Sequence, residues 1–540
     1  MKTPRISRIS RFHEGRHAGV LVPLFSIPSE RSWGIGEIGD LACFAAWLRE
    51  AGHDFVQLLP VTEVASGETS PYSAMTAMAI DPIYISLADV PEFQAIGGEG
   101  AASPPARYAI DVVRRAPRIR YDAVRALKRE ALRAAFEQIV EGGRIAPART
   151  NAFDAFVARE RWWLDDYARF RAIRQSAGLP WSEWPEPLRN REAAALEAAD
   201  GELAHEIRFF RYVQWIADEQ WHAARDQAGV GLFGDLPFMV GGDSADVWAR
   251  QGEFCLDVSV GTPPDAFSEE GQNWGLPVYR WDVVEAGGDE WLRQRARRGA
   301  SLYDGYRIDH VVGFYRTFVR PLQGGPFHAP KRTRDFKPYF APTDEPAQRA
   351  QGERIIAAFQ SAGALVIAED LGSIPDFVRA SLASLGVPGF HVLRWACDWK
   401  ATSRPFCDPR TWPARSVGVS GTHDTTPLAE WWDAADVEER RALLAIPDLA
   451  SRGLSVSSGF EPGLRDAILD TILASGSDYV ITPIQDLFGW RDRINVPATT
   501  GPQNWTWRLP WPSDRMMKVP EAHDRAVALA AMTERHGRTR

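Results

Sequence analysis

The chain has 540 residues, of which 45% are hydrophobic and 25% are charged, as in a globular protein with a large core. Its net charge of −9 argues against nucleic acid or an anionic membrane as a partner, because both repel a negative surface. Four cysteines without paired metal spacing do not make a disulfide scaffold. With no secretory signal and no apolar run long enough to cross a bilayer, we expect a cytoplasmic protein.

Eight short apolar runs predict β-strands. In chain order they span residues 19–25, 55–61, 231–240, 303–311, 364–371, 390–397, 416–421 and 479–487. Several are followed by helix-like stretches, such as residues 41–48 after the first run. This alternation predicts an α/β protein built on a (β/α)8 TIM barrel, in which active sites lie at the carboxyl ends of the strands.

Two long segments interrupt this alternation. From about residue 121 to residue 229 the chain is rich in Ala, Arg and Glu, with apolar residues at three- and four-residue intervals. We therefore expect residues 82–200 to form a helical insertion between the second and third strands. Residues 241–300 are expected to form a loop subdomain between the third and fourth strands. Both interrupt one barrel that spans residues 1–540.

Two motifs point to other classes of site. Residues 13–17 read H-E-G-R-H and match the zinc-protease pattern, but Gly15 disfavours the helix that such a site requires. We interpret this segment as a polar turn.

Residues 34–39 match G-x-G-x-x-G, with Asp54 twenty positions beyond Gly34. Because the loop at 26–33 separates these glycines from the preceding strand, we interpret them as the turn into the first barrel helix, not as a dinucleotide site.

Three carboxylate motifs follow three of the predicted strands. They are R-I-D-H at residues 307–310, A-E-D-L-G at 368–372 and G-T-H-D at 421–424. Strands four, five and seven of a (β/α)8 barrel would bring these motifs to the same end. Cleavage of a glycosidic bond needs a nucleophile, a proton donor and a charge stabiliser, which three acids can supply.

Each acid has a predicted role. Asp309 is the expected nucleophile, because Arg307 lies on the same face of the strand and can pair with it. Glu369 is the expected acid/base, since Asp309 and Asp424 should raise its pKa and keep its proton near neutral pH. Asp424 can hold sugar hydroxyls as the ring flattens toward an oxocarbenium ion, and His423 can donate to one of them. For Arg307 and Asp309 alone an ordinary ion pair is an equal alternative.

The order of these motifs resembles the conserved regions of the α-amylase clan, in its 4-α-glucanotransferase branch of amylomaltases and disproportionating enzymes. Further stretches are similar to that branch. They are W-G-I-G-E-I-G-D at 33–40, S-P-Y-S-A at 70–74, G-D-L-P at 234–237, D-S-A-D-V-W at 243–248, P-P-D at 263–265, G-Q-N-W-G-L-P at 271–277 and N-W-T-W-R at 504–508. The resemblance extends from about Gly19 to Leu509.

The resemblance implies transfer of an α-1,4-glucan segment, through a covalent glycosyl-enzyme on Asp309, to the 4-OH of another sugar. It carries over Asp309 as nucleophile, Glu369 as acid/base and Asp424 as transition-state stabiliser. It also implies that the substrate is contacted by Arg307, His423, Asp235, Tyr72, Trp274, Asp265, Gln272 and Asp370.

The family needs no metal or organic cofactor. The implied partners are malto-oligosaccharides, starch- or glycogen-derived α-glucans, and glucose or maltose as acceptor. Because the sequence extends only a short way past the eighth predicted strand, we expect no C-terminal β-domain of the kind that amylases have.

Two alternatives remain open. A hydrolase or a maltose-type transglucosylase would use the same residues and differ in water exclusion at the acceptor side, which a sequence does not display. A non-catalytic glucan-binding protein is a more distant alternative, because such a protein would be expected to have lost one of the acids.

Ala266 stands where many family members have an aromatic residue, and residues 322–346 do not align with the family. Donor and acceptor preference therefore stays open.

Overall fold

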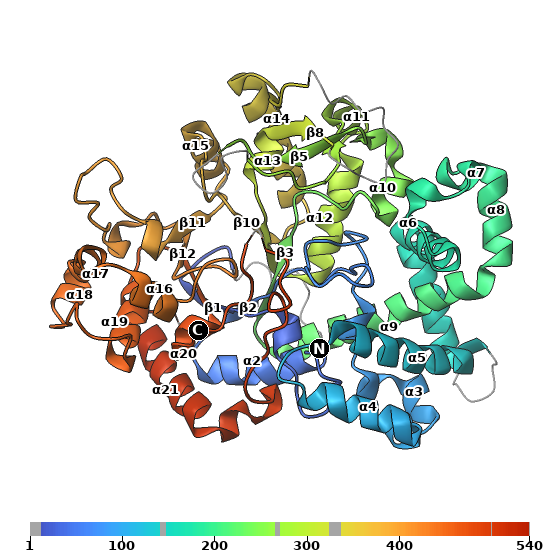
Figure 1. Ribbon diagram of the computed structural model, residues 1–540, viewed down its shortest axis with the longest axis horizontal. Coiled ribbons are helices and arrows are strands. Elements are labelled where there is room, and N and C mark those ends of the chain that lie inside the picture. Colours follow the sequence, from blue (N-terminus) through green and yellow to red (C-terminus); the bar gives the residue numbers. More distant parts are fainter. Residues whose placement is uncertain (1–11, 141–146, 265–270, 323–335, 498, 539–540) are drawn as a thin grey trace.

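The computed structural model describes residues 12–140, 147–264, 271–322, 336–497 and 499–538 (Figure 1). Its centre is a closed barrel of parallel strands in the order β1-β13-β12-β11-β10-β7-β3-β2. These strands are β1 (His17–Leu21), β2 (Phe55–Gln57), β3 (Gly231–Leu236), β7 (Gly305–Ile308), β10 (Leu365–Ala368), β11 (Gly389–Val392), β12 (Ser416–Val419) and β13 (Tyr479–Pro483). Each overlaps a predicted strand, and the (β/α)8 prediction is confirmed.

Aromatic rings fill the amino-terminal half of the barrel. The rings of Phe55 and Phe233 stack with centroids 4.3 Å apart, and Phe12 meets Phe233 edge-on at 5.0 Å. Glycines opposite them leave the necessary room, since a Cβ added to Gly19 would lie 2.2 Å from Phe55 and one added to Gly231 would lie 2.4 Å from Phe12. The barrel is thus a packed core, and chemistry is confined to its rim.

Several predicted strands extend beyond the carboxyl ends of the observed strands. Residues Leu24–Ser26 (η1) and Leu393–Trp395 (η7) are 3-10 turns, and Ile484–Phe488 forms the short helix α20. Most side chains of these segments are buried, although Trp395 is 42% exposed, and none of the segments pairs with a strand. Apolarity alone therefore could not mark where each strand ends.

Helices surround the barrel (Figure 1). They are α2 (Asp40–Glu50), α9 (Ala204–Ala228), α12 (Glu290–Leu302), α13 (Val312–Tyr315), α14 (Glu345–Gln360), α15 (Asp376–Ser384), α16 (Leu428–Ala434), α17 (Val437–Leu444), α18 (Pro447–Ala450), α19 (Pro462–Leu473), α20 and α21 (Pro520–Arg535). The expected first barrel helix at 41–48 is α2.

Both competing motifs adopt the local structure that we predicted. Residues 34–39 lead directly into α2, and a Cβ on Gly36 would lie 1.8 Å from the carbonyl oxygen of Leu24. The glycines therefore permit a close turn. Residues 13–15 form a bend and His17 already belongs to β1, so the two histidines do not share a helix.

The chain between β2 and helix α9 is mostly helical, as the periodicity predicted. Its helices are α3 (Pro91–Ala95), α4 (Pro104–Arg115), α5 (Tyr121–Val140), α6 (Pro147–Ala177), α7 (Glu186–Arg189) and α8 (Ala193–Glu202). Helix α6 packs along α9, so the inserted helices are joined to the barrel wall. Trp181 begins the 3-10 turn η5 (Trp181–Glu183), Trp184 follows it, and both are buried. The limits 82–200 for this insertion stay a prediction.

Small antiparallel sheets lie between β3 and β10. Strand β4 (Phe254–Cys255) pairs with β6 (Val278–Tyr279), and β5 (Val258–Gly261), β8 (Thr317–Pro321) and β9 (Tyr339–Ala341) form a second sheet. Helices α10 (Ala245–Ala249) and α11 (Trp281–Ala286) accompany them. The limits 241–300 for a subdomain stay a prediction.

Short 3-10 turns complete the described elements. They are η2 (Pro82–Tyr84), η3 (Leu87–Asp89), η4 (Gly98–Ala101), η6 (Gln251–Glu253), η8 (Pro409–Thr411) and η9 (Ser513–Lys518). After β13, the described residues form α20, η9 and α21 and no further strand. No helix within the described ranges has the length and apolarity needed to cross a bilayer.

Candidate active site

Four strands bring charged side chains to one end of the barrel. The residues are Asp235 on β3, Arg307 on β7 with Asp309 just beyond it, Glu369 after β10, and His423 and Asp424 after β12. The backbone N–H of Asp309 donates to the carbonyl of Leu236 at 3.0 Å, and that of Glu369 donates to the carbonyl of Ile308 at 3.0 Å. Ladder hydrogen bonds between neighbouring strands therefore fix the backbone of both acids.

Arg307 joins two of the carboxylates. Its Nη1 donates to Oδ2 of Asp235 at 2.6 Å, and its Nη2 donates to Oδ1 of Asp309 at 2.7 Å. Burial lowers the pKa of Arg307, but the two carboxylates outweigh burial and raise it well above its ordinary value. The side chain of Asp309 is 29% exposed, whereas that of Asp235 is fully buried. Asp309 is thus the member of this network that a substrate can reach.

Glu369 is held by backbone donors and has a strongly perturbed pKa. Its Oε2 accepts from the N–H of His310 at 2.8 Å, and its Oε1 accepts from the N–H of Leu371 at 3.1 Å. Burial raises the pKa of Glu369 to about 7, and the charge of Asp309 adds to this effect. The sequence predicted a raised pKa from neighbouring carboxylates, but burial is the larger cause. Glu369 can therefore both donate and accept a proton near neutral pH.

Tyr72 connects the two halves of the site. It lies in the loop after β2, and its hydroxyl donates to Oδ2 of Asp235 at 2.7 Å. The same hydroxyl lies 3.0 Å from Nε2 of His423, which is 3.3 Å from Oδ2 of Asp424. One hydrogen-bonded network therefore links β3 and β7 to β12.

The second half of the site is an ion pair. Burial raises the pKa of Asp424, but the charge and hydrogen bond of His423 outweigh it and hold the pKa below its ordinary range. Burial lowers the pKa of His423, but Asp424 outweighs it and raises the pKa above its ordinary value. Asp424 is consequently an anion at neutral pH. It contrasts with Glu369, whose environment favours the protonated form.

Two residues without a predicted role complete this half. Nδ2 of Asn495, in the segment after α20, donates to Oδ1 of Asp424 at 2.6 Å. The indole of Trp505 packs against the rings of Tyr72 and His423, with centroids 5.9 Å from each. Trp505 belongs to the N-W-T-W-R stretch, so the family-like motif was a usable signal. For Asn495 the only signal was its place in the loop after the last strand.

Trp274 and Gln272 lie beside the acids. The indole of Trp274 meets the ring of His310 edge-on, with centroids 4.8 Å apart, and His310 directly follows Asp309. The indole N–H donates to Oε1 of Gln272 at 3.0 Å. A partly exposed aromatic face therefore borders the carboxylates. Asp265 lies outside the described residues.

Asp370 is engaged elsewhere. Its Oδ1 accepts from the backbone N–H of Phe390 on β11 at 2.7 Å, and its Oδ2 lies 3.6 Å from Nε of Arg379 on α15. The side chain is buried. These contacts hold the start of β11, and a role for Asp370 in substrate binding stays a prediction.

In the described part of the chain, no three His, Cys, Asp or Glu side chains are grouped to hold a metal ion.

Comparison with known proteins agrees with this geometry. Residues 22–514 match the family model described as 4-alpha-glucanotransferase. A 4-alpha-glucanotransferase of Thermus thermophilus is 34% identical over 96% of this chain and 99% of its own length. A chloroplastic or amyloplastic 4-alpha-glucanotransferase of Oryza sativa is 33% identical over 92% of this chain and 80% of its own.

Solved structures give the same result. An amylomaltase from Streptococcus agalactiae in complex with acarbose is 26% identical, superposes with a TM-score of 0.79, and is matched over 97% of this chain and all of its own. The amylomaltase from Corynebacterium glutamicum shares the fold, with a TM-score of 0.79 over 98% of this chain and 77% of its own, at 24% identity. On the family match and the identity to curated relatives, this chain belongs to the 4-alpha-glucanotransferase family.

Proposed function

We propose that this chain transfers an α-1,4-glucan segment from a malto-oligosaccharide donor to the 4-OH of a sugar acceptor by retaining double displacement. The main support is the placement of Asp309 and Glu369 after the neighbouring strands β7 and β10. Neighbouring strands lie about 4.8 Å apart, close to the carboxyl separation of about 5 Å that retaining enzymes require. The second support is the difference between Asp309, which is paired with Arg307, and Glu369, whose pKa is about 7.

In the first half-reaction Asp309 attacks the anomeric carbon of the donor. Arg307 holds Oδ1 of Asp309, so Oδ2 is the attacking oxygen. Glu369 gives its proton to the glycosidic oxygen as the bond from that oxygen to the anomeric carbon breaks. The shortened glucan leaves, and an ester bond joins the remaining segment to Asp309.

Asp424 stabilises the positive charge that develops on the sugar ring. Its carboxylate is held on one side by His423 and on the other by Asn495, so it is oriented before the substrate arrives. Hydrogen bonds from sugar hydroxyls to such a fixed anion strengthen as the ring flattens. The partly exposed face of Trp274 offers apolar surface for a sugar ring.

In the second half-reaction the acceptor replaces the leaving glucan. Glu369, now ionised, takes the proton of the acceptor 4-OH, whose oxygen attacks the anomeric carbon and releases Asp309. Two displacements at the same carbon retain its configuration. Glucose, maltose and longer malto-oligosaccharides have the hydroxyl that this step needs.

Incubation with maltotriose tests the proposal. Transfer predicts glucose together with products longer than maltotriose, because each removed segment is passed to another chain. Steady shortening without any longer product would assign the site to hydrolysis. Binding of maltotriose without any product would assign the chain to glucan binding alone. Maltose in place of maltotriose then gives the shortest donor.

A further inference from the structure

The backbone of Trp505 has an unusual conformation beside the candidate active site. Its φ angle is +62°, in the left-handed region that a bulky residue rarely adopts. The side chain is nevertheless buried, with 7% exposure, and its indole packs against Tyr72 and His423. Such a conformation persists only where surrounding contacts hold it, and residues of this kind cluster at functional sites.

Hydrogen bonds from Trp505 and its neighbour hold the segment that contains Asn495. The backbone N–H of Trp505 donates to the carbonyl oxygen of Ile494 at 2.8 Å. The backbone N–H of Val496 donates to Oδ1 of Asn504 at 3.1 Å. These two bonds lie immediately before and after Asn495, whose amide group holds the carboxylate of the G-T-H-D motif. The backbone of Asn495 is therefore fixed on both sides.

The inserted helices hold the same segment from the other direction. Tyr121, the first residue of α5, donates its hydroxyl to the carbonyl oxygen of Trp505 at 2.7 Å. The backbone N–H of Ile119 donates to the carbonyl oxygen of Thr506 at 3.0 Å. Burial raises the pKa of Tyr121 well above its ordinary value, so the hydroxyl keeps its proton and stays a donor.

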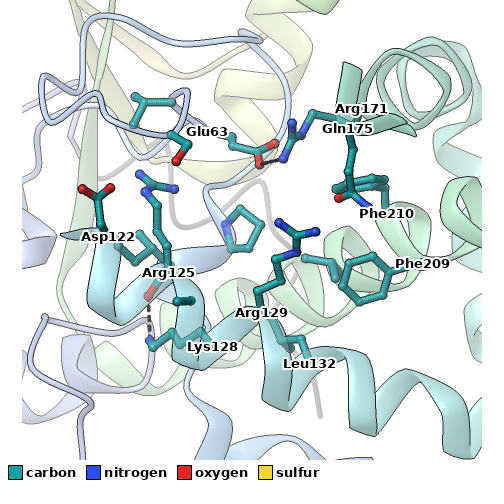
Figure 2. Close-up of a pocket in the computed structure, with 16 residues that line it drawn as sticks. Glu63, Asp122, Arg125, Lys128, Arg129, Leu132, Arg171, Gln175, Phe209 and Phe210 are labelled. Atoms are coloured by element: carbon teal, nitrogen blue, oxygen red, sulfur yellow. Dashed lines mark hydrogen bonds and ion pairs between the residues drawn. The ribbon is translucent and has the colours of Figure 1, made fainter. Parts of the chain in front are cut away.

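Helix α5 is itself fixed against the barrel. Arg125 makes two parallel hydrogen bonds to Asp81, at 2.9 and 2.8 Å. Three residues later, Lys128 pairs with Glu37 at 2.7 Å and donates to the carbonyl oxygen of Ile83 at 2.6 Å. Figure 2 shows Arg125 and Lys128 on this helix. A hydroxyl at the start of an anchored helix is a fixed point from which a neighbouring segment can be positioned.

We propose that Trp505 and Tyr121 are positioning residues for Asp424. Tyr121 holds the carbonyl group of Trp505, and the N–H of Trp505 holds the segment after α20. Asn495 in that segment then holds Asp424. The ring of Trp505 also lies against His423, the second group that orients the same carboxylate. This inference rests on the proposed function, in which a fixed Asp424 stabilises the charge that develops on the sugar ring.

Tyr121→Phe removes one hydroxyl and keeps the ring, so it tests this connection with almost no change of shape. We expect kcat for the consumption of maltotriose to fall about tenfold, because Asp424 loses its fixed orientation. KM should change less than about twofold, since the effect is on the transition state and not on the bound substrate. Consumption counts transfer and hydrolysis alike, so the result does not depend on which of the two occurs.

The matched control is Tyr479→Phe. Tyr479, the first residue of β13, is also buried, and its hydroxyl donates to the carbonyl oxygen of Phe12 at the opposite end of the barrel from the acids. The control loses the same kind of hydrogen bond and should keep the wild-type kcat. Melting temperatures show that both variants are folded during the assay. A kcat within about twofold of wild type in Tyr121→Phe, or an equal fall in Tyr479→Phe, would overturn the proposal.

A double-mutant cycle tests the route through Asn495. In an Asn495→Ala background, Tyr121→Phe should lower kcat by less than about threefold, because the side chain through which it acts is absent. The same loss in both backgrounds would show that the two residues act independently, and the positioning role would then be wrong.

The imidazole of His423 gives a test that needs no turnover. Burial lowers the pKa of His423, but Asp424 outweighs burial and raises it. We expect this pKa, followed by NMR, to be lower in Tyr121→Phe than in wild type and in Tyr479→Phe, since a less fixed Asp424 pairs less well with His423. An unchanged pKa would refute the positioning role. A lowered pKa in a chain whose wild type consumes no maltotriose would count against the proposed function alone.

Discussion

The protonation state of Glu369 should control the upper pH limit of the reaction. Its pKa is raised from 4.5 to about 7. This corresponds to roughly 3 kcal/mol of preference for the protonated form, at about 1.36 kcal/mol per pKa unit. At pH 7 about half of the molecules then have the proton, against about one in 300 for an unperturbed glutamate. Since the folded pKa is the higher one, the proton is present below pH 7 and is lost as the pH rises.

The assay is kcat/KM for maltotetraose as donor between pH 5 and pH 9. Wild-type activity should fall about tenfold per pH unit well above pH 7, because the general acid is lost. Asp424, with its lowered pKa, stays ionised throughout this range. Glu369→Gln should lower the rate about 10²- to 10⁴-fold and remove this pH dependence.

A nitrophenyl glycoside gives the control, since nitrophenolate departs without a proton. In Glu369→Gln the release of nitrophenolate in the first turnover should be reduced much less than cleavage of maltotetraose. The reasoning would be refuted by a wild-type profile that is flat from pH 6 to pH 9. It would also be refuted if Glu369→Gln kept the alkaline fall.

Three further substitutions test other parts of the structure. Asp309→Asn should abolish transfer from maltotriose while calorimetry still detects glucan binding; retained activity would remove Asp309 from its role. Asn495→Ala frees one oxygen of Asp424 and should lower kcat about tenfold or more with little change in KM, whereas a change confined to KM would contradict positioning. Lys128→Met leaves Glu37 buried without its 2.7 Å partner and should reduce the free energy of unfolding in urea by about 3–5 kcal/mol; a loss below about 1 kcal/mol would show that the pair is not charged.

Much of the barrel could be predicted because its strands are buried on both faces. Continuous apolar runs such as residues 364–371 then stand out from the amphipathic helices between them. The rule that parallel strands end at the same rim predicts that Asp309, Glu369 and Asp424 lie together. Their connection through Arg307 and Tyr72 was not predictable, because it depends on the course of the loop after β2.

Local patterns determined which residue types stand at the rim, and in what order, because strand and helix periodicities are properties of neighbouring residues. The tertiary structure decided what those residues do to one another. Burial, more than neighbouring charge, sets the pKa of Glu369, and His423 with Asn495 sets the state and orientation of Asp424. Desolvation and charge proximity act through space, so sequence order does not contain them.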